Sequence, residues 1–324
     1  MKKRKSILIA AVLMTGACAQ PKQSSETVLN EVSSSEVSYV SLQIDNDMTN
    51  TKHTFVFFSE DGTCAGSYSV NTKGDMSYTY YDDPHDTFYC FGPGGLYGVS
   101  LGDEHPLISF ISGENINCVI PDSEGRLYMY INGGYRNEGG YDAAILTPSG
   151  QRIELDAPVH SMRLHEGLLY AETVYNTPEG FSKAIISVFS TENYELIAEY
   201  DRGLSSGMMT EFNDQICIAA DDGLYSIEDG TLYPYTGNEE PIGLTSYEGD
   251  LFTVDGSEYL LSGEDDQRYI YIIESDGENC SLSKVHNVTD AQNIYGIMGV
   301  SGESRFHDEC EERPGFCNFH GRCH

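Results

Sequence analysis

The stretch Gly167-Leu168-Leu169-Tyr170 shows the pattern that decides the fold: a turn residue is followed directly by apolar and aromatic residues. Glycine permits a tight turn, and neighbouring apolar and aromatic residues favour a strand. The pattern recurs at intervals of about 40 residues, which indicates a repeated supersecondary unit. Its copies end at Tyr89, Tyr128, Tyr170, Cys217, Phe252 and Tyr295.

Further short strands are predicted between the copies, separated by turn residues. Examples are the strands over 143–147 and 224–227, each followed by a turn sequence that contains glycine. Several short strands in each unit of about 40 residues are typical of β-propeller blades. Residues 38–302 therefore resemble the six- to eight-bladed propeller proteins of bacteria. The resemblance implies an all-β fold, in which small sheets pack in a ring; a β-sandwich or a solenoid is the structural alternative.

The two ends of this region predict how the ring closes. Strands are expected over 38–44, 54–59, 65–70 and 78–81, before the first copy of the pattern, and over 294–300 after the last. Three of these four N-terminal strands, with the one from the C-terminal side, would complete a shared blade. Six blades are therefore favoured, and seven remain possible.

The N-terminus has the features of an export signal. A basic region over 2–5 precedes the short apolar run over 7–14, which is too short to span a bilayer permanently. Residues 1–18 end in Gly16-Ala17-Cys18, and this ending resembles the lipobox of bacterial lipoproteins. The resemblance implies that Cys18 is lipidated and anchors the chain in a membrane, at the cell surface or the periplasmic face. The alternative is an ordinary secretory peptide cut after Ala19, which would release the chain.

Residues 19–37 are rich in Ser, Gln and Glu and predict a flexible linker between membrane and folded body. The whole chain of 324 residues has a formal charge of −33. Without the basic residues of the N-terminal signal, 14 Lys and Arg stand against 51 Asp and Glu. Such an acidic body excludes nucleic acid as a partner, because it repels phosphates.

The C-terminal segment 303–324 differs in composition, with Cys310, Cys317 and Cys323 close together. The spacing, and the aromatic residue before Cys317, resemble the first half of an EGF-like module. The resemblance implies a disulfide between Cys310 and Cys323, and for Cys317 a partner that the sequence does not contain. The alternative is zinc bound by these cysteines with His320 and its neighbours, but an oxidising compartment favours disulfides. We predict no bound metal or other cofactor.

The remaining cysteines are Cys64, Cys90, Cys118, Cys217 and Cys280, and their pairing cannot be deduced from the sequence. Cys217 replaces an aromatic residue in the repeated pattern, so we expect a buried thiol there.

Catalytic motifs are weak. The segment 203–207 matches G-x-S-x-G, but a nucleophile elbow needs a helix after the serine, and the following residues are too few. Segment 45–56 lacks the glycine and glutamate of an EF-hand. His160, His165 and His286 have no nearby nucleophile and no metal-ligand spacing, so we interpret them as surface or satisfied core histidines.

We therefore expect no catalytic residues and an exported binding protein, with a membrane anchor and an unknown protein, peptide or glycan ligand. The alternative is an extracytoplasmic propeller enzyme, a metal-assisted lyase or hydrolase. Acidic loops such as 221–222 and 265–266 could hold its cation. His and carboxylate side chains that converge at the channel would favour the enzyme.

Overall fold

The computed structural model describes residues 26–37, 39–46, 51–59, 63–76, 78–135, 141–176, 182–203, 209–220, 222–236, 250–254, 257–264, 267–276 and 279–287. Within these ranges the chain consists of β-strands and two short 3-10 helices, η1 (Ser34–Glu36) and η2 (Asp83–His85). None of the helices in these ranges is long and apolar enough to cross a membrane.

The strands form six antiparallel sheets in chain order, called sheets 1 to 6 here. Sheet 1 contains β2 (Tyr39–Asn46), β3 (Thr51–Phe58) and β4 (Cys64–Thr72). Sheet 2 contains β5 (Tyr78–Asp82), β6 (Thr87–Gly92), β7 (Gly95–Ser100) and β8 (Leu107–Ser112), with β1 (Glu26–Val28) added beside β8. Sheet 3 contains β9 (Ile116–Pro121), β10 (Leu127–Tyr135), β11 (Tyr141–Leu146) and β12 (Arg152–Leu155).

Sheet 4 contains β13 (Val159–His165), β14 (Leu168–Asn176), β15 (Ser182–Ser190) and β16 (Leu196–Gly203). Sheet 5 contains β17 (Met209–Phe212), β18 (Gln215–Ala220), β19 (Gly223–Ser226) and β20 (Leu232–Thr236). Sheet 6 contains β21 (Asp250–Val254), β22 (Ser257–Glu264), β23 (Gln267–Asp276) and β24 (Asn279–Asn287). Sheets 5 and 6 are also joined at their edges, where β20 and β24 pair in parallel.

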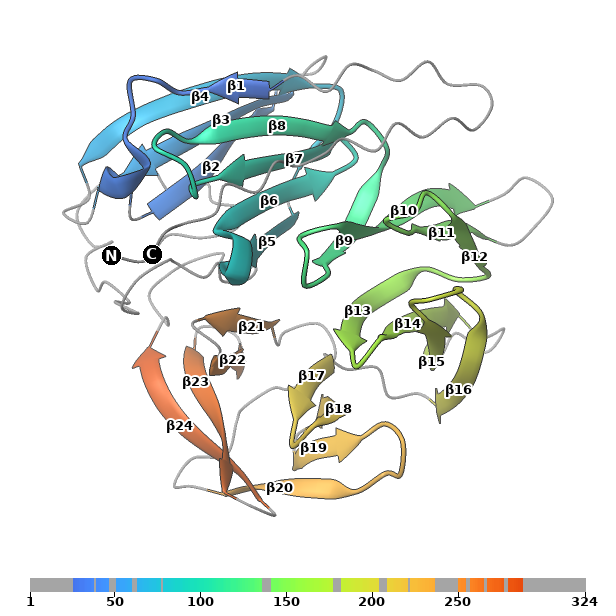
Figure 1. Cartoon of the computed structure of the whole chain (residues 1–324). Helices are drawn as coiled ribbons and strands as arrows, with labels where there is room; N and C mark the ends of the chain where they lie inside the picture. The colour runs from blue at the N-terminus through green and yellow to red at the C-terminus, as the bar shows by residue number, and fades with distance from the viewer. Residues whose placement is uncertain are drawn as a thin grey trace.

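The sheets are arranged around a ring (Figure 1). The first strands β5, β9, β13, β17 and β21 lie toward its middle, and the fourth strands β8, β12, β16, β20 and β24 lie at its periphery. This is the architecture of a β-propeller, in which each sheet is one blade. The ring confirms the all-β propeller fold and excludes the alternatives of a β-sandwich and a solenoid.

Hydrophobic cores between neighbouring sheets hold the ring together. Each core combines buried side chains of one sheet with those of the next: sheets 1 and 2, 2 and 3, 3 and 4, 4 and 5, and 5 and 6. In the core between sheets 1 and 2, for example, Leu42 and Phe55 contact the layer that contains Phe88 and Val99. A single blade exposes two apolar faces, so packing in a ring is what removes them from water.

The repeated sequence pattern falls on the second strand of four successive sheets. Phe88-Tyr89, Leu127-Tyr128, Leu169-Tyr170 and Ile216-Cys217 lie on β6, β10, β14 and β18. The copy at Leu251-Phe252 differs, because it lies on β21, the first described strand of sheet 6. The pattern marks a strand that leaves a tight turn and does not specify the position of that strand in its sheet. The last copy, at Tyr295, lies outside the described residues.

Two expectations for the N-terminal region need correction. The strand expected over 78–81 does not belong to the first blade, since β5 pairs with β6 and opens sheet 2. Residues 26–37, part of the predicted linker over 19–37, lie against sheets 1 and 2: β1 pairs with β8, and Val32 is only 4% exposed and belongs to the core between these two sheets. This segment is polar overall, but a few apolar residues are enough to hold it on the folded body. Gly66 has no side chain and so leaves the space that the Val32 side chain occupies. The strand expected over 294–300 lies outside the described residues.

A buried histidine fastens sheet 1 to the start of sheet 2. His53 on β3 is fully buried, and its Nε2 accepts a hydrogen bond of 3.0 Å from the backbone N–H of Met76. Its other ring nitrogen, Nδ1, therefore carries the proton and donates to Oγ1 of Thr72 at 3.2 Å. Burial lowers the pKa of His53, and this outweighs the opposing effect of Asp75. Protonation would place a hydrogen on Nε2 of His53, and Nε2 could then no longer accept the hydrogen bond from the backbone N–H of Met76.

We predict that acidification destabilises the fold through His53. The unfolded histidine has a pKa of about 6.5, and the folded one binds its proton less readily, so the unfolded state gains protons first as the pH falls. The free energy of unfolding should fall by up to about 1 kcal/mol between pH 6.5 and 5.5 from this residue. Urea unfolding of the protein and of His53→Gln at both pH values measures it. Equal pH dependence in the two proteins would show that His53 does not carry the effect.

Candidate functional site

Four tight turns, each joining the first and second strand of a blade, form what we call the turn face. They are the turns of sheets 2, 3, 4 and 5, over residues 83–86, 122–126, 166–167 and 213–214. Each contains at least one residue with a positive φ angle, among them Asp86, Gly125, Glu166, Gly167, Asn213 and Asp214. Two such residues in succession, as in the turns of sheets 4 and 5, are typical of type I′ hairpins. Contacts between successive blades, described below, place the four turns on one face of the ring.

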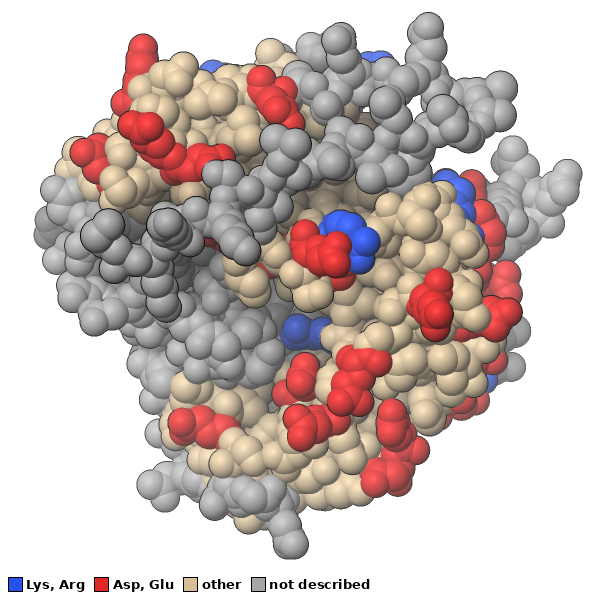
Figure 2. Space-filling view, in the orientation of Figure 1, with Lys and Arg blue, Asp and Glu red and all other residues tan. Residues whose placement is uncertain are grey.

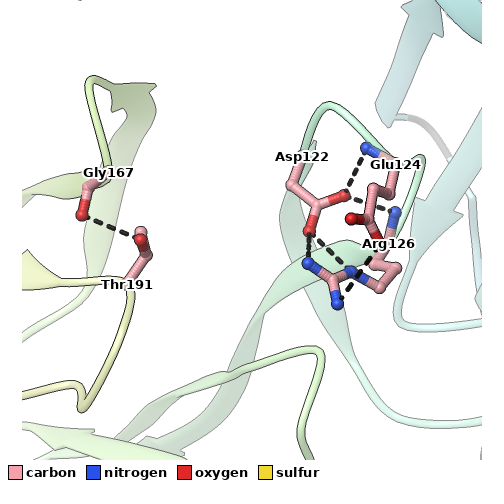
Figure 3. A network of polar contacts seen from close by, with 5 residues as sticks. All are labelled: Asp122, Glu124, Arg126, Gly167 and Thr191. Atoms are coloured by element: carbon pink, nitrogen blue, oxygen red, sulfur yellow. Dashed lines mark hydrogen bonds and ion pairs between the residues drawn. The ribbon is translucent and has the colours of Figure 1, made fainter.

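The turn of sheet 3 is held by one carboxylate. Asp122 accepts hydrogen bonds of 2.9 Å from the backbone N–H groups of Glu124 and Arg126, and its other oxygen binds the Arg126 guanidinium at 2.8 Å (Figure 3). Partial burial alone would raise the pKa of Asp122, but these bonds from Arg126 and Glu124 hold it below its ordinary value. The carboxylate is thus ionised and fixes the turn in one conformation.

Contacts between blades join the turns into a continuous belt. The ring of His85, which bonds Asp82 at 2.8 Å, packs on Gly125 of the next turn, where a β-carbon would lie 3.3 Å from the imidazole. Tyr128 of sheet 3 meets the ring of Tyr194, from the last turn of sheet 4, edge to face. Figure 3 shows the neighbouring hairpins of sheets 3 and 4, including the bond from Thr191 to the carbonyl of Gly167.

The belt continues through sheets 4, 5 and 6. Nε2 of His165, in the turn region of sheet 4, donates to the carbonyl oxygen of Asp214 in the next turn at 3.0 Å. Ser275 of sheet 6 donates to Oδ1 of Asn213 at 2.7 Å. His165 thus links two blades. We infer that the turn face is a preorganised surface.

The turn face is acidic. Its exposed carboxylates include Glu124, Glu166 and Asp214. Figure 2 shows one face of the molecule, with acidic side chains gathered over the blades around a central hollow and a basic side chain inside that hollow. A ligand that lies across the turn face therefore meets mainly negative charge.

A second polar centre lies on the first strands, away from the turns. His160 is an extra residue in β13, because its neighbours Val159 and Ser161 pair with the consecutive residues Thr173 and Glu172 of β14. Its Nδ1 lies 2.7 Å from Oε2 of Glu172, whose side chain is fully buried, whereas the imidazole is 22% exposed. A bulge of this kind re-aims a side chain, here toward a buried carboxylate.

The equivalent strand of the preceding blade has the same irregularity. Asn117 is the extra residue of β9, since Ile116 and Cys118 pair with the consecutive residues Ile131 and Tyr130. Its Oδ1 and the hydroxyls of Ser161 and Thr79 are buried without a hydrogen-bond partner in the structure. Three successive first strands therefore carry polar atoms that water or a ligand would satisfy.

The interpretation of His160 and His165 as surface or satisfied core histidines agrees with the structure, since His160 contacts Glu172 and His165 bonds the carbonyl oxygen of Asp214. Two other expectations agree with the structure: Cys217 is fully buried, and Met209–Phe212, shortly after the G-x-S-x-G match, form the strand β17 and not a helix. His286 lies on β24. The site residues Cys18, Cys310, Cys317 and Cys323, and the acidic loop 265–266, lie outside the described residues. In the described part of the chain, no three His, Cys, Asp or Glu side chains come together as metal ligands.

Comparisons with known proteins add little beyond the fold. No family model and no curated protein matches the chain. The β-propeller domain of the Trilobed protease from Pyrococcus furiosus is 14% identical, with a TM-score of 0.43, over 77% of this chain and 85% of that one. The Dos1 propeller is 12% identical, with a TM-score of 0.43, over 77% and 70%.

A third solved structure, dihydro-heme d1 dehydrogenase NirN in complex with DHE, is 15% identical with a TM-score of 0.40. The match covers 76% of this chain and 56% of that one, so this chain spans little more than half of its length. We draw nothing about function from these similarities, and the fold assignment rests on the sheets themselves.

Proposed function

We propose that this protein is an exported binding protein that holds a protein, peptide or glycan ligand on the turn face of its propeller. The observation that carries the proposal is the belt of contacts from His85 to Ser275, which joins turns of successive blades. A surface already held in one conformation loses little entropy when a ligand binds. Propellers present their loops as such rigid binding sites.

The export and the anchor are part of the same proposal. Cys18 would carry the lipid, and the short segment before β1 would connect the membrane to sheet 2. The C-terminal segment 303–324, with its EGF-like spacing of cysteines, would serve as a spacer or a second interaction unit. The acidity of the turn face favours a ligand whose contacting groups are neutral or positively charged.

One observation favours the alternative of an extracytoplasmic enzyme. His160 and Glu172 form the imidazole–carboxylate pair that many acid–base catalysts contain. A nucleophile would have to lie within hydrogen-bond reach of this imidazole, but the neighbouring Ser161 hydroxyl has no hydrogen-bond partner in the structure. The described residues also lack a set of metal ligands for a metal-assisted lyase or hydrolase. The proposal of binding rests on the belt of contacts at the turn face.

A photo-crosslinking amino acid at Glu124 tests binding at the turn face. We expect ultraviolet light on intact producing cells to yield one covalent adduct from this position, because the side chain is exposed on the turn face. Position Glu154, which is exposed on the peripheral strand β12, is the matched control and should yield none. Equal adducts from both positions, or none from Glu124, would contradict the proposal. In the same cells, Cys18→Ser should release the chain from the membrane fraction.

A further inference from the structure

The five cysteines of the described residues are not distributed evenly among the cores. Cys64 is exposed, Cys90 belongs to the core between sheets 1 and 2, and Cys118 packs against the core between sheets 3 and 4. Cys217 and Cys280 belong to the same core, the one between sheets 5 and 6. Among the cysteine pairings that the sequence leaves open, the structure therefore favours Cys217 with Cys280.

Cys217 and Cys280 come from different sheets but contribute to one packed layer. Cys217 lies on β18 and Cys280 on β24, and both are fully buried among side chains such as Leu224 and Tyr271. The parallel pairing of β20 with β24 sets Cys280 opposite Tyr235, which packs against the same core. Burial raises the pKa of the Cys280 thiol to about 12, and the neighbouring Cys217 thiol contributes to this shift.

We propose that Cys217 and Cys280 form a disulfide that fastens sheet 6 to sheet 5. Both thiols are free in the structure, so the bond is a modification of this fold. The two thiols lose two protons and two electrons as the S–S bond forms, and the oxidant takes them up: the disulfide of an oxidoreductase becomes a dithiol, or one oxidised glutathione becomes two glutathione thiols. The proposal rests on export, because an oxidising compartment supplies that oxidant.

The proposed disulfide would strengthen the contact between sheets 5 and 6. Apart from the core, the described residues join sheets 5 and 6 through the pairing of β20 with β24, which extends over two residue pairs, and through the hydrogen bond from Ser275 to Asn213. Cys217 and Cys280 enclose about 60 residues, and a cross-link over such a loop restricts the unfolded chain strongly. We expect the disulfide to raise Tm by about 10 °C.

The reactivity of the two thiols determines when the disulfide can form during folding. Thiolate is the reacting form, and burial also raises the pKa of Cys217 to about 12, so both thiols are protonated and shielded once the sheets have packed. The disulfide must therefore form before sheet 6 closes on sheet 5. A chain that folds under reducing conditions and then meets an oxidant should retain both thiols, whereas the exposed Cys64 reacts.

Oxidative refolding of the purified mature chain tests the proposal. The chain is unfolded with reductant and refolded in a mixture of reduced and oxidised glutathione. Digestion without reduction, followed by mass spectrometry, should give a peptide pair that joins Cys217 to Cys280 and is two hydrogens lighter than its parts. Reduction should then lower Tm, and Cys217→Ala and Cys280→Ala should each abolish this sensitivity. Cys90→Ala, which removes a buried thiol from another core, should retain it.

Two results would overturn the proposal: Cys217 and Cys280 both alkylated after oxidative refolding and denaturation, or either one joined to a different cysteine. The mapping uses the unaltered chain, so it does not depend on whether the variants fold. It also does not depend on export. The disulfide could form in this mixture although cells keep the protein in a reducing compartment. That result would support the pairing of Cys217 with Cys280 and contradict the proposed export.

Discussion

Phe55→Ala is expected to lower the free energy of unfolding by about 3–5 kcal/mol, the range for removing a large aromatic side chain from a core. Phe55 lies on β3, is fully buried between sheets 1 and 2, and has its ring centroid 6.3 Å from that of Tyr97 on β7. The loss combines the transfer of apolar surface with the cavity that the surrounding strands cannot fill. Urea unfolding measures it.

Phe58→Ala is the matched control for this prediction. Phe58 lies on the same strand but is only half-buried and belongs to none of the cores. We expect a loss below about 1.5 kcal/mol, because less apolar surface is removed from the folded state. Equal losses at the two positions would show that sheet 1 does not pack on sheet 2 through the face that contains Phe55.

His160→Ala is expected to lower the free energy of unfolding by about 2–3 kcal/mol, although the imidazole is partly exposed. The variant removes the 2.7 Å contact with Glu172, and the cost arises because a fully buried carboxylate loses a hydrogen-bond partner. Glu172→Gln in the same chain should offset a large part of the loss, since a neutral amide tolerates burial better.

A double-mutant cycle over His160 and Glu172 measures this coupling. We expect the loss in the double variant to be smaller than the sum of the two single losses by at least about 1 kcal/mol. Additive losses would mean that the two side chains act independently and that the bulge in β13 does not serve to pair them. His165→Ala is a useful comparison, because that imidazole bonds a backbone carbonyl and not a buried carboxylate.

The sequence predicts the repeating part of this fold well and its irregular parts poorly. Leu169-Tyr170 and its counterparts mark second strands, because a tight turn followed by buried residues has the same consequence in every blade. The pairing of His160 with Glu172 is not predictable by simple alternation, since the bulge shifts the side chains of β13 by one residue. A carboxylate inside the apolar strand that contains Leu169 and Tyr170 is the signal that was available, because such a residue needs a buried partner.

The docking of residues 26–37 on sheets 1 and 2 shows a second limit. Composition describes this segment as a polar linker, but Val32 finds a site that only the folded body creates, beside Gly66. The cysteines show a third limit: their spacing in the sequence carries no information on pairing, and only the packing of β18 and β24 into one core brings Cys217 and Cys280 together.

The central claim is that the turns of successive blades share one face and together form the binding surface. Distances between spin labels, measured by pulsed electron paramagnetic resonance, test it directly, with labels at the exposed positions Glu124, Glu166 and Asp156. Glu124 and Glu166 lie in the turns of neighbouring blades, which predicts a separation of about 10–20 Å from the spacing of packed sheets. Asp156 lies at the opposite end of β13, so its separation from Glu166 should be about 30 Å. A longer distance between Glu124 and Glu166 than between Glu166 and Asp156 would place the turns on different faces and contradict the account.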